Sequence, residues 1–402
     1  MWTNAVAYYP TLQAWIVGRE LAQLSIKSSD FRPEYPELGY MAALFKSLTG
    51  KFELSSKLSY RSKLNLCCLS VATASLCDLD GLPGTTGVNM FLVTGGAMRA
   101  QRQLADIHLV RRRQILDAHP DVRKLEGASL HTCIPIMLIG ITHVVTAVAL
   151  RQEPWWLLLI AAYTIGAVLA LGLWTLLHEC THDLVFRTPR SNKWLGIAVA
   201  LPLIIPAAST FRKCHLLHHK YPNDTVLDGD VPSEWEIRFV GHSAFRKALW
   251  LMCAPILQSF RPMRMKGVAI VDKWSLNNLA VQIIFNLLVF AISGTSGFCY
   301  LLLSNIFALG FNPLGARWIQ EHFRLVPNQE TFSYYGWVNK LVFNAGYHVE
   351  HHDMMRIPWM RLPKLREAAP EFYEHLYSYR SWTALLLHFL FDTKIDLNRR
   401  LR

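Results

Sequence analysis

Residues 155–182 read WWLLLIAAYTIGAVLALGLWTLLHECTH and join a long apolar segment to a histidine motif. Residues 155–177 carry no charge, and a helix of this length is about 35 Å long, enough to cross a hydrocarbon core of about 30 Å. Two tryptophans open the segment, as is typical of the membrane–water interface. His178 and His182 follow on one face of the same helix, because positions i and i+4 lie one above the other. The stretch therefore predicts a membrane-spanning helix that ends in a metal-binding motif just outside the hydrocarbon.

Two further histidine clusters repeat this spacing farther along the chain. The second contains His215, His218 and His219, and the third contains His348, His351 and His352. With the first motif they supply eight imidazoles, more than one metal ion can hold, so we expect two metals. Imidazole without cysteine suits iron, zinc or copper better than magnesium or calcium. Cys180 and Cys214 lie in or beside the clusters, and we expect them to pack rather than to bind metal.

Composition places the chain among integral membrane proteins. Of its 402 residues, 52% are hydrophobic and only 17% are charged. Four apolar segments are expected to span the membrane as two hairpins, at 129–150, 155–177, 278–293 and 298–311. Two other apolar patches, 194–209 and 248–260, are broken by proline or too short to cross. We expect both patches to be interfacial or re-entrant.

The distribution of basic residues predicts the topology. They precede the first span, fill a loop region at 183–275 and recur after residue 316, whereas the two hairpin turns carry only Arg151. By the positive-inside rule, both termini and all three clusters then face the cytosol. The net charge of +12 fits an anionic membrane surface. The sequence has no basic module interleaved with aromatic residues, so we expect no nucleic-acid partner.

These features predict an all-α integral membrane protein with four transmembrane helices in two hairpins and a cytosolic, histidine-rich domain. Histidine-ligated metals at a membrane surface suit oxygen activation by iron, because the membrane supplies an apolar substrate and the protein excludes water. The expected domain is therefore a di-iron domain. Four regions are expected: an N-terminal extension of unknown role at 1–97, a basic segment at the membrane surface at 98–128, the di-iron domain at 129–395 and a C-terminal tail at 396–402.

A protease is the alternative from a different class of enzyme. His178-Glu179-Cys180-Thr181-His182 is also an HExxH motif, in which the two histidines bind zinc and Glu179 is the general base. Leu227-Asp228-Gly229 resembles the segment that completes the site of intramembrane metalloproteases. This alternative gives the other two clusters no role. A transporter with histidine-rich loops would leave their regular spacing unexplained.

Three polar residues near the clusters have two interpretations each. Glu179 and Glu350 either hydrogen-bond to metal ligands and orient them, or are solvated helix residues. Asn344 either contacts a metal through water or caps the helix that carries the third cluster.

The clusters and their flanking residues resemble the membrane fatty-acyl desaturases and hydroxylases. The third cluster within residues 344–353, together with 331–336, 228–232 and 111–116, is similar to the sphingolipid Δ4-desaturase branch, the dihydroceramide desaturases. The resemblance covers about residues 100–395. It implies four membrane spans, a multi-pass location in the endoplasmic reticulum and two non-haem irons that use O2.

The resemblance also implies a ninth ligand in a Glu-His pair before the third cluster, which Glu321-His322 matches. The implied metal ligands are His178, His182, His215, His218, His219, His322, His348, His351 and His352. The implied reaction is Δ4 desaturation of the long-chain base of dihydroceramide, with some hydroxylation. The alternative on the same scaffold is desaturation or hydroxylation of acyl lipids. Electrons would come from a separate cytochrome b5 and its NAD(P)H-dependent reductase, since the chain has no His-Pro-Gly-Gly haem signature.

One segment departs from the resemblance. Family members usually carry histidines in the stretch that corresponds to 311–318, and this chain has none there. The three clusters are unaffected. Because the segment lies close to His322 in the sequence, we expect it to reshape the substrate channel and leave the metals in place.

Overall fold

The computed structural model describes residues 107–265, 267–327 and 329–401. The expected N-terminal extension at 1–97 lies outside the described residues. Within them the regular structure is helical, apart from one short pair of parallel strands, β1 (Ser333–Tyr334) and β2 (Ser378–Tyr379). An unlabelled helix over 107–118 comes first. The labelled α-helices are α5 (Cys133–Ala149), α6 (Trp155–Ala161), α7 (Ala167–Thr181), α8 (Pro189–Ala200), α9 (Ala208–Lys220), α10 (Glu234–Val240), α11 (Ala244–Phe260), α12 (Lys273–Leu309), α13 (Arg317–His322), α14 (His348–Asp353), α15 (Leu362–Ala368) and α16 (Trp382–Phe391).

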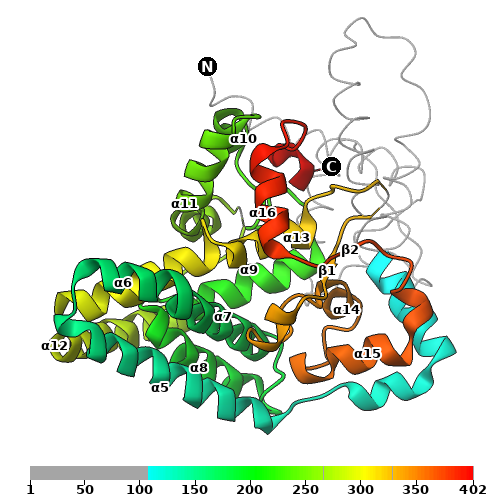
Figure 1. Cartoon of the computed structure of the whole chain (residues 1–402). Helices are drawn as coiled ribbons and strands as arrows, with labels where there is room; N and C mark the ends of the chain where they lie inside the picture. The colour runs from blue at the N-terminus through cyan, green and yellow to red at the C-terminus, as the bar shows by residue number, and fades with distance from the viewer. Residues whose placement is uncertain (1–106, 266, 328, 402) are drawn as a thin grey trace, which may run out of the picture. The chain divides into compact units, whose positions relative to one another are not determined.

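Three helical segments are long and apolar enough to cross a membrane, at Leu130–Gln152, Trp155–Thr181 and Lys273–His322. A fourth is present if the bent pair Pro189–Leu203 and Ala208–Lys220 forms one broken span. Helix α12 packs against α5 and α7, and α7 packs against α8 (Figure 1). The prediction of a helical, multi-pass membrane protein is therefore confirmed.

Helix α12 consists of the two arms of a hairpin. At Gly294 the backbone leaves the helical region, with φ of 63° and ψ of −169°. Asn286 on one arm donates to the carbonyl of Ile204 (3.0 Å), and Asn305 on the other arm donates to the carbonyl of Leu203 (3.5 Å). In a straight helix these asparagines would be about 28 Å apart. The carbonyls that they bind belong to the adjacent residues Leu203 and Ile204, whose Cα atoms are within about 4 Å of each other. The chain therefore turns back at Gly294 alone, and the helix resumes at once where a four-residue turn was expected.

The apolar patch at 194–209 is a sharp bend between α8 and α9. The two helices are bent by 112° relative to each other, and Ile204 at the bend has a φ of 57°. Such a bend frees backbone carbonyls that hydrocarbon cannot hydrogen-bond. Gln282 of α12 donates to the carbonyl of Leu201 (3.0 Å), and Asn286 satisfies that of Ile204. Polar side chains of α12 thus stabilise a broken helix, which fits the expected re-entrant character.

The region at 183–275 is mostly helical, so its prediction as a charged loop was wrong. Helix α8 begins where Thr188 accepts from a backbone N–H, α10 begins at Ser233 in a capping box, and α11 begins where Ser243 accepts from a backbone N–H. These side chains satisfy the unpaired N–H groups of a first helical turn. The apolar patch at 248–260 is the body of α11. The high charge content of this region concealed its helices in the sequence, although capping residues mark where those helices begin.

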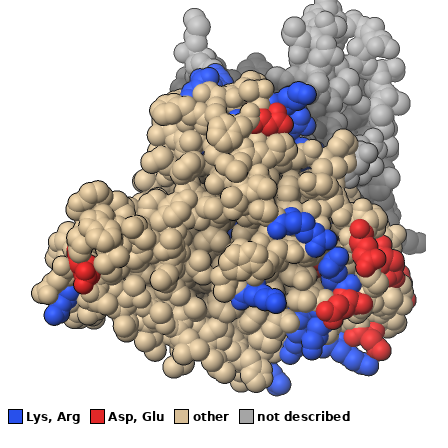
Figure 2. All heavy atoms as spheres, in the orientation of Figure 1, with Lys and Arg blue, Asp and Glu red and all other residues tan. Residues whose placement is uncertain are grey.

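The surface of the membrane-type helices is apolar. Large apolar side chains are exposed at Ile134, Leu138, Ile141 and Val145 on α5 and at Ile284, Leu287 and Leu288 on α12. Figure 2 shows one small group of charged side chains at the far end of this region, whereas many more gather on the opposite side, toward α15. An exposed apolar surface of this extent suits contact with lipid.

Candidate metal centre

The structure brings all nine predicted histidines together from four elements: the end of α7, α9, α13 and α14. They form two adjacent groups, within each of which the ligand atoms lie within 4.8 Å of one another. The first group is His178, His182, His215, His219 and His351. The second group is His218, His322, His348 and His352. All three clusters of the sequence therefore meet at one place.

Helical spacing explains how two helices serve both groups. Residues i and i+4 of a helix lie nearly in line, whereas residue i+3 is displaced by about 60° around the axis. Helix α9 accordingly gives His215 and His219 to the first group and His218 to the second. Helix α14 does the reverse, because its middle histidine, His351, joins the first group and the other two join the second. The repeated His-x-x-His-His pattern thus divides its imidazoles between two sites.

The contacts between ring nitrogens fit a shared cation better than hydrogen bonds. Nε2 of His215 lies 2.9 Å from Nε2 of His182 and 3.0 Å from Nε2 of His219. Nε2 of His322 lies 2.9 Å from Nε2 of both His218 and His348. An imidazole nitrogen carries either one proton or one lone pair, so it cannot form two linear hydrogen bonds at once. A metal ion accepts every one of these lone pairs, so the residues present fit a metal in each group.

The number and spacing of the nitrogens also bear on the coordination. Two nitrogens bound at about 2.1 Å to one ion are about 3.0 Å apart at a right angle and about 3.4 Å apart at the tetrahedral angle. The contacts of 2.9–3.0 Å match the right angle. The first group also offers five histidines, more than the four ligands of a tetrahedral structural zinc site. The first group would thus suit an ion that takes more than four ligands, whereas the four histidines of the second group do not distinguish the two cases.

Burial keeps four of these imidazoles neutral. It lowers the pKa of His182, His348, His351 and His352 well below the usual value of 6.5, and neighbouring histidines lower the pKa values further. Burial removes the hydration that would stabilise the charged ring. Neutral rings present the lone pairs that metal ligation needs.

Carboxylates contact the outer nitrogens of two histidines in the second group. Asp228 Oδ2 lies 2.9 Å from Nδ1 of His218. Burial raises the pKa of Asp228, but His218 and Arg400 lower it by more, so the carboxyl pKa lies well below its ordinary value. Glu321 is paired with Arg317 and lies 3.5 Å from Nδ1 of His348. Such contacts orient metal-binding imidazoles. The sequence pointed to Asp228 only as part of the segment that would complete a protease site and of the family resemblance, and did not predict its contact with His218.

The helix over 107–118 supports the third cluster from outside. Arg111 donates to both oxygens of Asp353 (3.1 Å each), and Nδ1 of His108 lies 2.6 Å from the same carboxylate. Ile115 is fully buried in a cluster that includes Val349. The basic segment predicted at 98–128 thus contacts the site through the part that the structure describes.

Glu179 and Glu350 are both buried, so their interpretation as solvated residues was wrong. Glu350 accepts hydrogen bonds from Ser333 (2.6 Å) and from the hydroxyl of Tyr335 (2.5 Å). Burial raises its carboxyl pKa above the ordinary value, although these two hydrogen bonds oppose the rise. Glu179 accepts from the backbone N–H of Trp359 (3.1 Å), and its other oxygen lies 3.9 Å from Nδ1 of His178.

Asn344 does not cap the helix of the third cluster, so that interpretation was wrong. Helix α14 begins at His348, and its N-cap is Tyr347, without a side-chain cap. Asn344 has a left-handed φ of 55° and donates to the carbonyl of Trp359 (3.0 Å). It lines a cavity beside the histidines.

This cavity, of about 90 Å³, reaches histidines of both groups. Its apolar walls include Leu171, Trp174, Phe211, Trp318 and Phe343. Its polar side chains include Asp230, Gln258, Arg317 and Asn344. Arg317 and Trp318 belong to the segment 311–318, which was expected to reshape the substrate channel, and both line this cavity. The lining suits an apolar chain that carries a polar end.

The arrangement does not favour the protease hypothesis. Asp228 of the proposed completing segment contacts His218, while His178 and His182 group with three histidines from the other clusters. The two further clusters therefore have a place in the same site.

Comparison with known proteins assigns the family. Residues 154–383 match the family described as Fatty acid desaturase. The chain is 36% identical over 295 residues to a sphingolipid delta(4)-desaturase DES1-like protein of Oryza sativa subsp. japonica, which covers 73% of this chain and 89% of that protein. It is 35% identical over 297 residues to the sphingolipid delta(4)-desaturase/C4-monooxygenase DES2 of Homo sapiens, which covers 73% of this chain and 91% of that protein. The chain is therefore an enzyme of the fatty acid desaturase family.

Proposed function

We propose that this enzyme introduces the Δ4 double bond into the long-chain base of dihydroceramide at a histidine-ligated di-iron site. The observation that carries the proposal is the pair of histidine groups, five and four strong, beside a cavity with apolar walls and a few polar groups. The similarity to sphingolipid delta(4)-desaturases supports the choice of substrate.

The proposed reaction removes two hydrogens from neighbouring carbons of the substrate. One O2, two electrons and two protons enter, and two molecules of water leave, so atoms and electrons balance. Iron bound to the nine histidines would supply the oxygen activation that unactivated C–H bonds require. We expect the electrons to come from a separate cytochrome b5, which an NAD(P)H-dependent reductase reduces.

The chain's own residues would hold the substrate and exclude water. Leu171 and Phe211 on the apolar walls would contact the hydrocarbon of the long-chain base. Asp230 and Asn344 would accept or donate hydrogen bonds at its polar end. Arg317 lies in the same cavity, within the segment that departs from the family. We therefore expect an altered preference for chain length or headgroup.

Hydroxylation at C4 is a second candidate activity. It is favoured by the similarity to relatives described as sphingolipid delta(4)-desaturase/C4-monooxygenases. Removal of the first hydrogen is common to both outcomes. Desaturation removes the second hydrogen, whereas hydroxylation instead delivers oxygen to the carbon.

We place the enzyme in the membrane of the endoplasmic reticulum, with both termini and all nine histidines on the cytosolic side. Basic residues flank the apolar segments on that side, as the positive-inside rule requires. A cytosolic site would also be accessible to a membrane-anchored cytochrome.

The substrate assignment is tested by feeding labelled dihydroceramide and labelled acyl lipids in parallel to cells that lack the activity and express this chain. Lipid mass spectrometry is expected to find a new double bond in the sphingoid base. A histidine-to-alanine variant of the same chain serves as the inactive control. A double bond that appears only in acyl chains would remove the sphingolipid assignment and leave the desaturase chemistry in place.

A further inference from the structure

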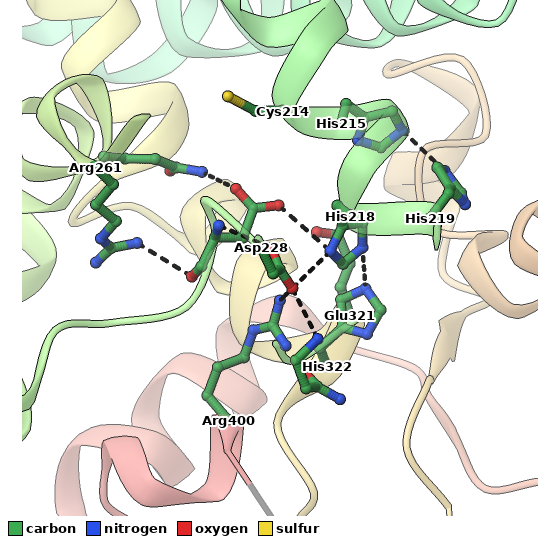
Figure 3. Close-up of polar contacts among 12 residues, drawn as sticks. Cys214, His215, His218, His219, Asp228, Arg261, Glu321, His322 and Arg400 are labelled. Atoms are coloured by element: carbon green, nitrogen blue, oxygen red, sulfur yellow. Dashed lines mark hydrogen bonds and ion pairs between the residues drawn. The ribbon is translucent and has the colours of Figure 1, made fainter. Parts of the chain in front are cut away.

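A short 3-10 turn far along the chain, η12 (Leu397–Arg400), reaches the second histidine group. The guanidinium of Arg400 lies 3.1 Å from Oδ2 of Asp228, the same oxygen that lies 2.9 Å from Nδ1 of His218 (Figure 3). Arg400 is 1% exposed and Asp228 is also 1% exposed. A buried line of contacts therefore runs from η12 through Asp228 to a predicted metal ligand.

Asp228 is held on every side. Its Oδ2 also accepts from the backbone N–H of Asn223 (2.9 Å), and its Oδ1 accepts from the backbone N–H of Asp230 (2.9 Å). Among the described residues, Arg400 is the one arginine or lysine paired with this carboxylate. A buried carboxylate that loses its cationic partner is strongly destabilised. Arg400 therefore keeps the Asp228 side chain in the position where it meets His218.

The loop that carries Asp228 is secured by other side chains of its own neighbourhood. Gln258 donates to Oδ1 of Asp230 (2.7 Å), and Arg261 donates to the backbone carbonyl of the same residue (3.2 Å). Arg264 donates to the carbonyl of Val231. Arg261 and Arg264 hold the backbone of the loop and Gln258 holds the side chain of Asp230, so the loop has anchors other than Arg400. The specific task left to Arg400 is the orientation of the Asp228 carboxylate.

The turn itself is anchored independently of Arg400. Leu397 is fully buried in the main core, and the backbone N–H of Arg324 donates to the carbonyl of Arg399 (2.9 Å). The side chain of Arg399 is exposed, although it is adjacent to Arg400. The turn thus places the side chain of Arg400 at the site and leaves the side chain of Arg399 in solvent.

We propose that Arg400 is a positioning residue for the second metal, acting through Asp228 on His218. The inference rests on the proposed two-metal site. The carboxylate accepts a hydrogen bond from the Nδ1–H of His218, which leaves the lone pair of Nε2 free and directed toward His322 and His348. Loss of such an outer partner typically lowers metal affinity by about 10- to 100-fold.

The test compares purified full-length Arg400→Ala with Arg399→Ala, which removes the same charge one residue away. Iron per chain is measured by mass spectrometry before and after a timed exposure to an iron chelator. Wild type and Arg399→Ala should retain two irons. Arg400→Ala should fall toward one, because only the second group loses its orientation. Arg400→Lys should retain more metal than Arg400→Ala, since it keeps a cation near Asp228.

A further variant separates positioning from simple stability. Leu397→Ala removes buried apolar contacts from the same turn without touching Asp228, so it should lower thermal stability and keep both irons. Equal iron loss in Leu397→Ala and Arg400→Ala at matched stability would overturn the proposal, as would full retention of iron by Arg400→Ala. If Arg400→Ala does not accumulate, Arg400→Lys against Arg399→Lys decides, and equal iron release by those two also overturns it. A wild-type chain that holds fewer than two metals would refute the proposed di-iron site itself, which is a distinguishable result.

Discussion

Arg212 connects the helix of the second cluster to the end of the helix of the first. It lies on α9 and donates to the carbonyls of Cys180 (2.9 Å) and Thr181 (2.8 Å) at the end of α7. It also makes a two-pronged ion pair with Asp183, at 3.0 and 2.8 Å. The last carbonyls of a helix have no partner within the helix. Arg212 supplies a hydrogen-bond donor to two of these carbonyls, and so connects the helix end that carries His178 and His182 to the helix of the second cluster.

The cost of removing Arg212 can be worked out from these contacts. A hydrogen bond with one charged partner contributes about 1.5–3 kcal/mol. The Arg212 side chain is 16% exposed, so water can partly replace it and the lower figure applies to each of the two carbonyls. The pair with Asp183, whose side chain is 31% exposed, adds little because solvent screens it. Arg212→Ala should therefore destabilise the protein by about 3 kcal/mol. Arg212→Lys should lose roughly half of that, because an ammonium lacks the planar fork of arginine.

The assay is equilibrium unfolding in mixed micelles, followed by circular dichroism. Arg190→Ala is the control, because Arg190 is exposed on α8 and its replacement removes the same charge. The control should lie within about 0.5 kcal/mol of wild type, as surface substitutions usually do. Arg212→Ala should also hold less iron in the first histidine group. If Arg212→Ala matched Arg190→Ala in both stability and iron content, the contacts of Arg212 would not stabilise the end of α7.

Three other changes have defined outcomes. A Cβ on Gly346 would lie 2.6 Å from Oδ1 of Asn339 and 2.7 Å from a backbone oxygen. Gly346→Ala should therefore cost about 1–3 kcal/mol in thermal unfolding, whereas Gly140→Ala, whose nearest neighbour is 3.8 Å away, should not destabilise the protein. Metal binding by metal-free protein should persist at about pH 6, because the lowered pKa values of His182, His348, His351 and His352 keep these rings neutral until the solution is more acidic; half-loss near pH 6.5 in a metal titration would contradict this. A chain that begins at Met98 should keep its specific activity when it is correctly targeted, because 1–97 contain no metal-ligand cluster; complete loss in a well-expressed form would show otherwise.

The grouping of the clustered histidines could be predicted because its information is local. Spacings of three and four residues determine which imidazoles share a face of a helix, and the structure brings all three clusters together. His322 has no cluster of its own, and only the resemblance to the family pointed to it. The pairing of Asp228 with Arg400 could not be predicted, since 172 residues separate them and neither spacing nor composition relates them.

The fold was predicted less completely where polar residues stabilise buried structure. In the hairpin of α12 only Gly294 leaves the helical region. A hydropathy average over many residues cannot locate a turn made by one residue. The bend between α8 and α9 depends on Gln282 and Asn286, which lie within the predicted span at 278–293, but the sequence does not show which carbonyls their side chains bind. Capping residues such as Ser233 were a local signal that could have identified the helices of 183–275.

The most direct test of the central claim is the metal content of the purified, active, full-length protein. We predict two irons per chain. His182→Ala and His322→Ala, which alter different groups, should each lower the content toward one and abolish turnover, while the protein still accumulates in the membrane. Active wild-type protein that contains one zinc and no iron would contradict the di-iron account and restore the protease hypothesis.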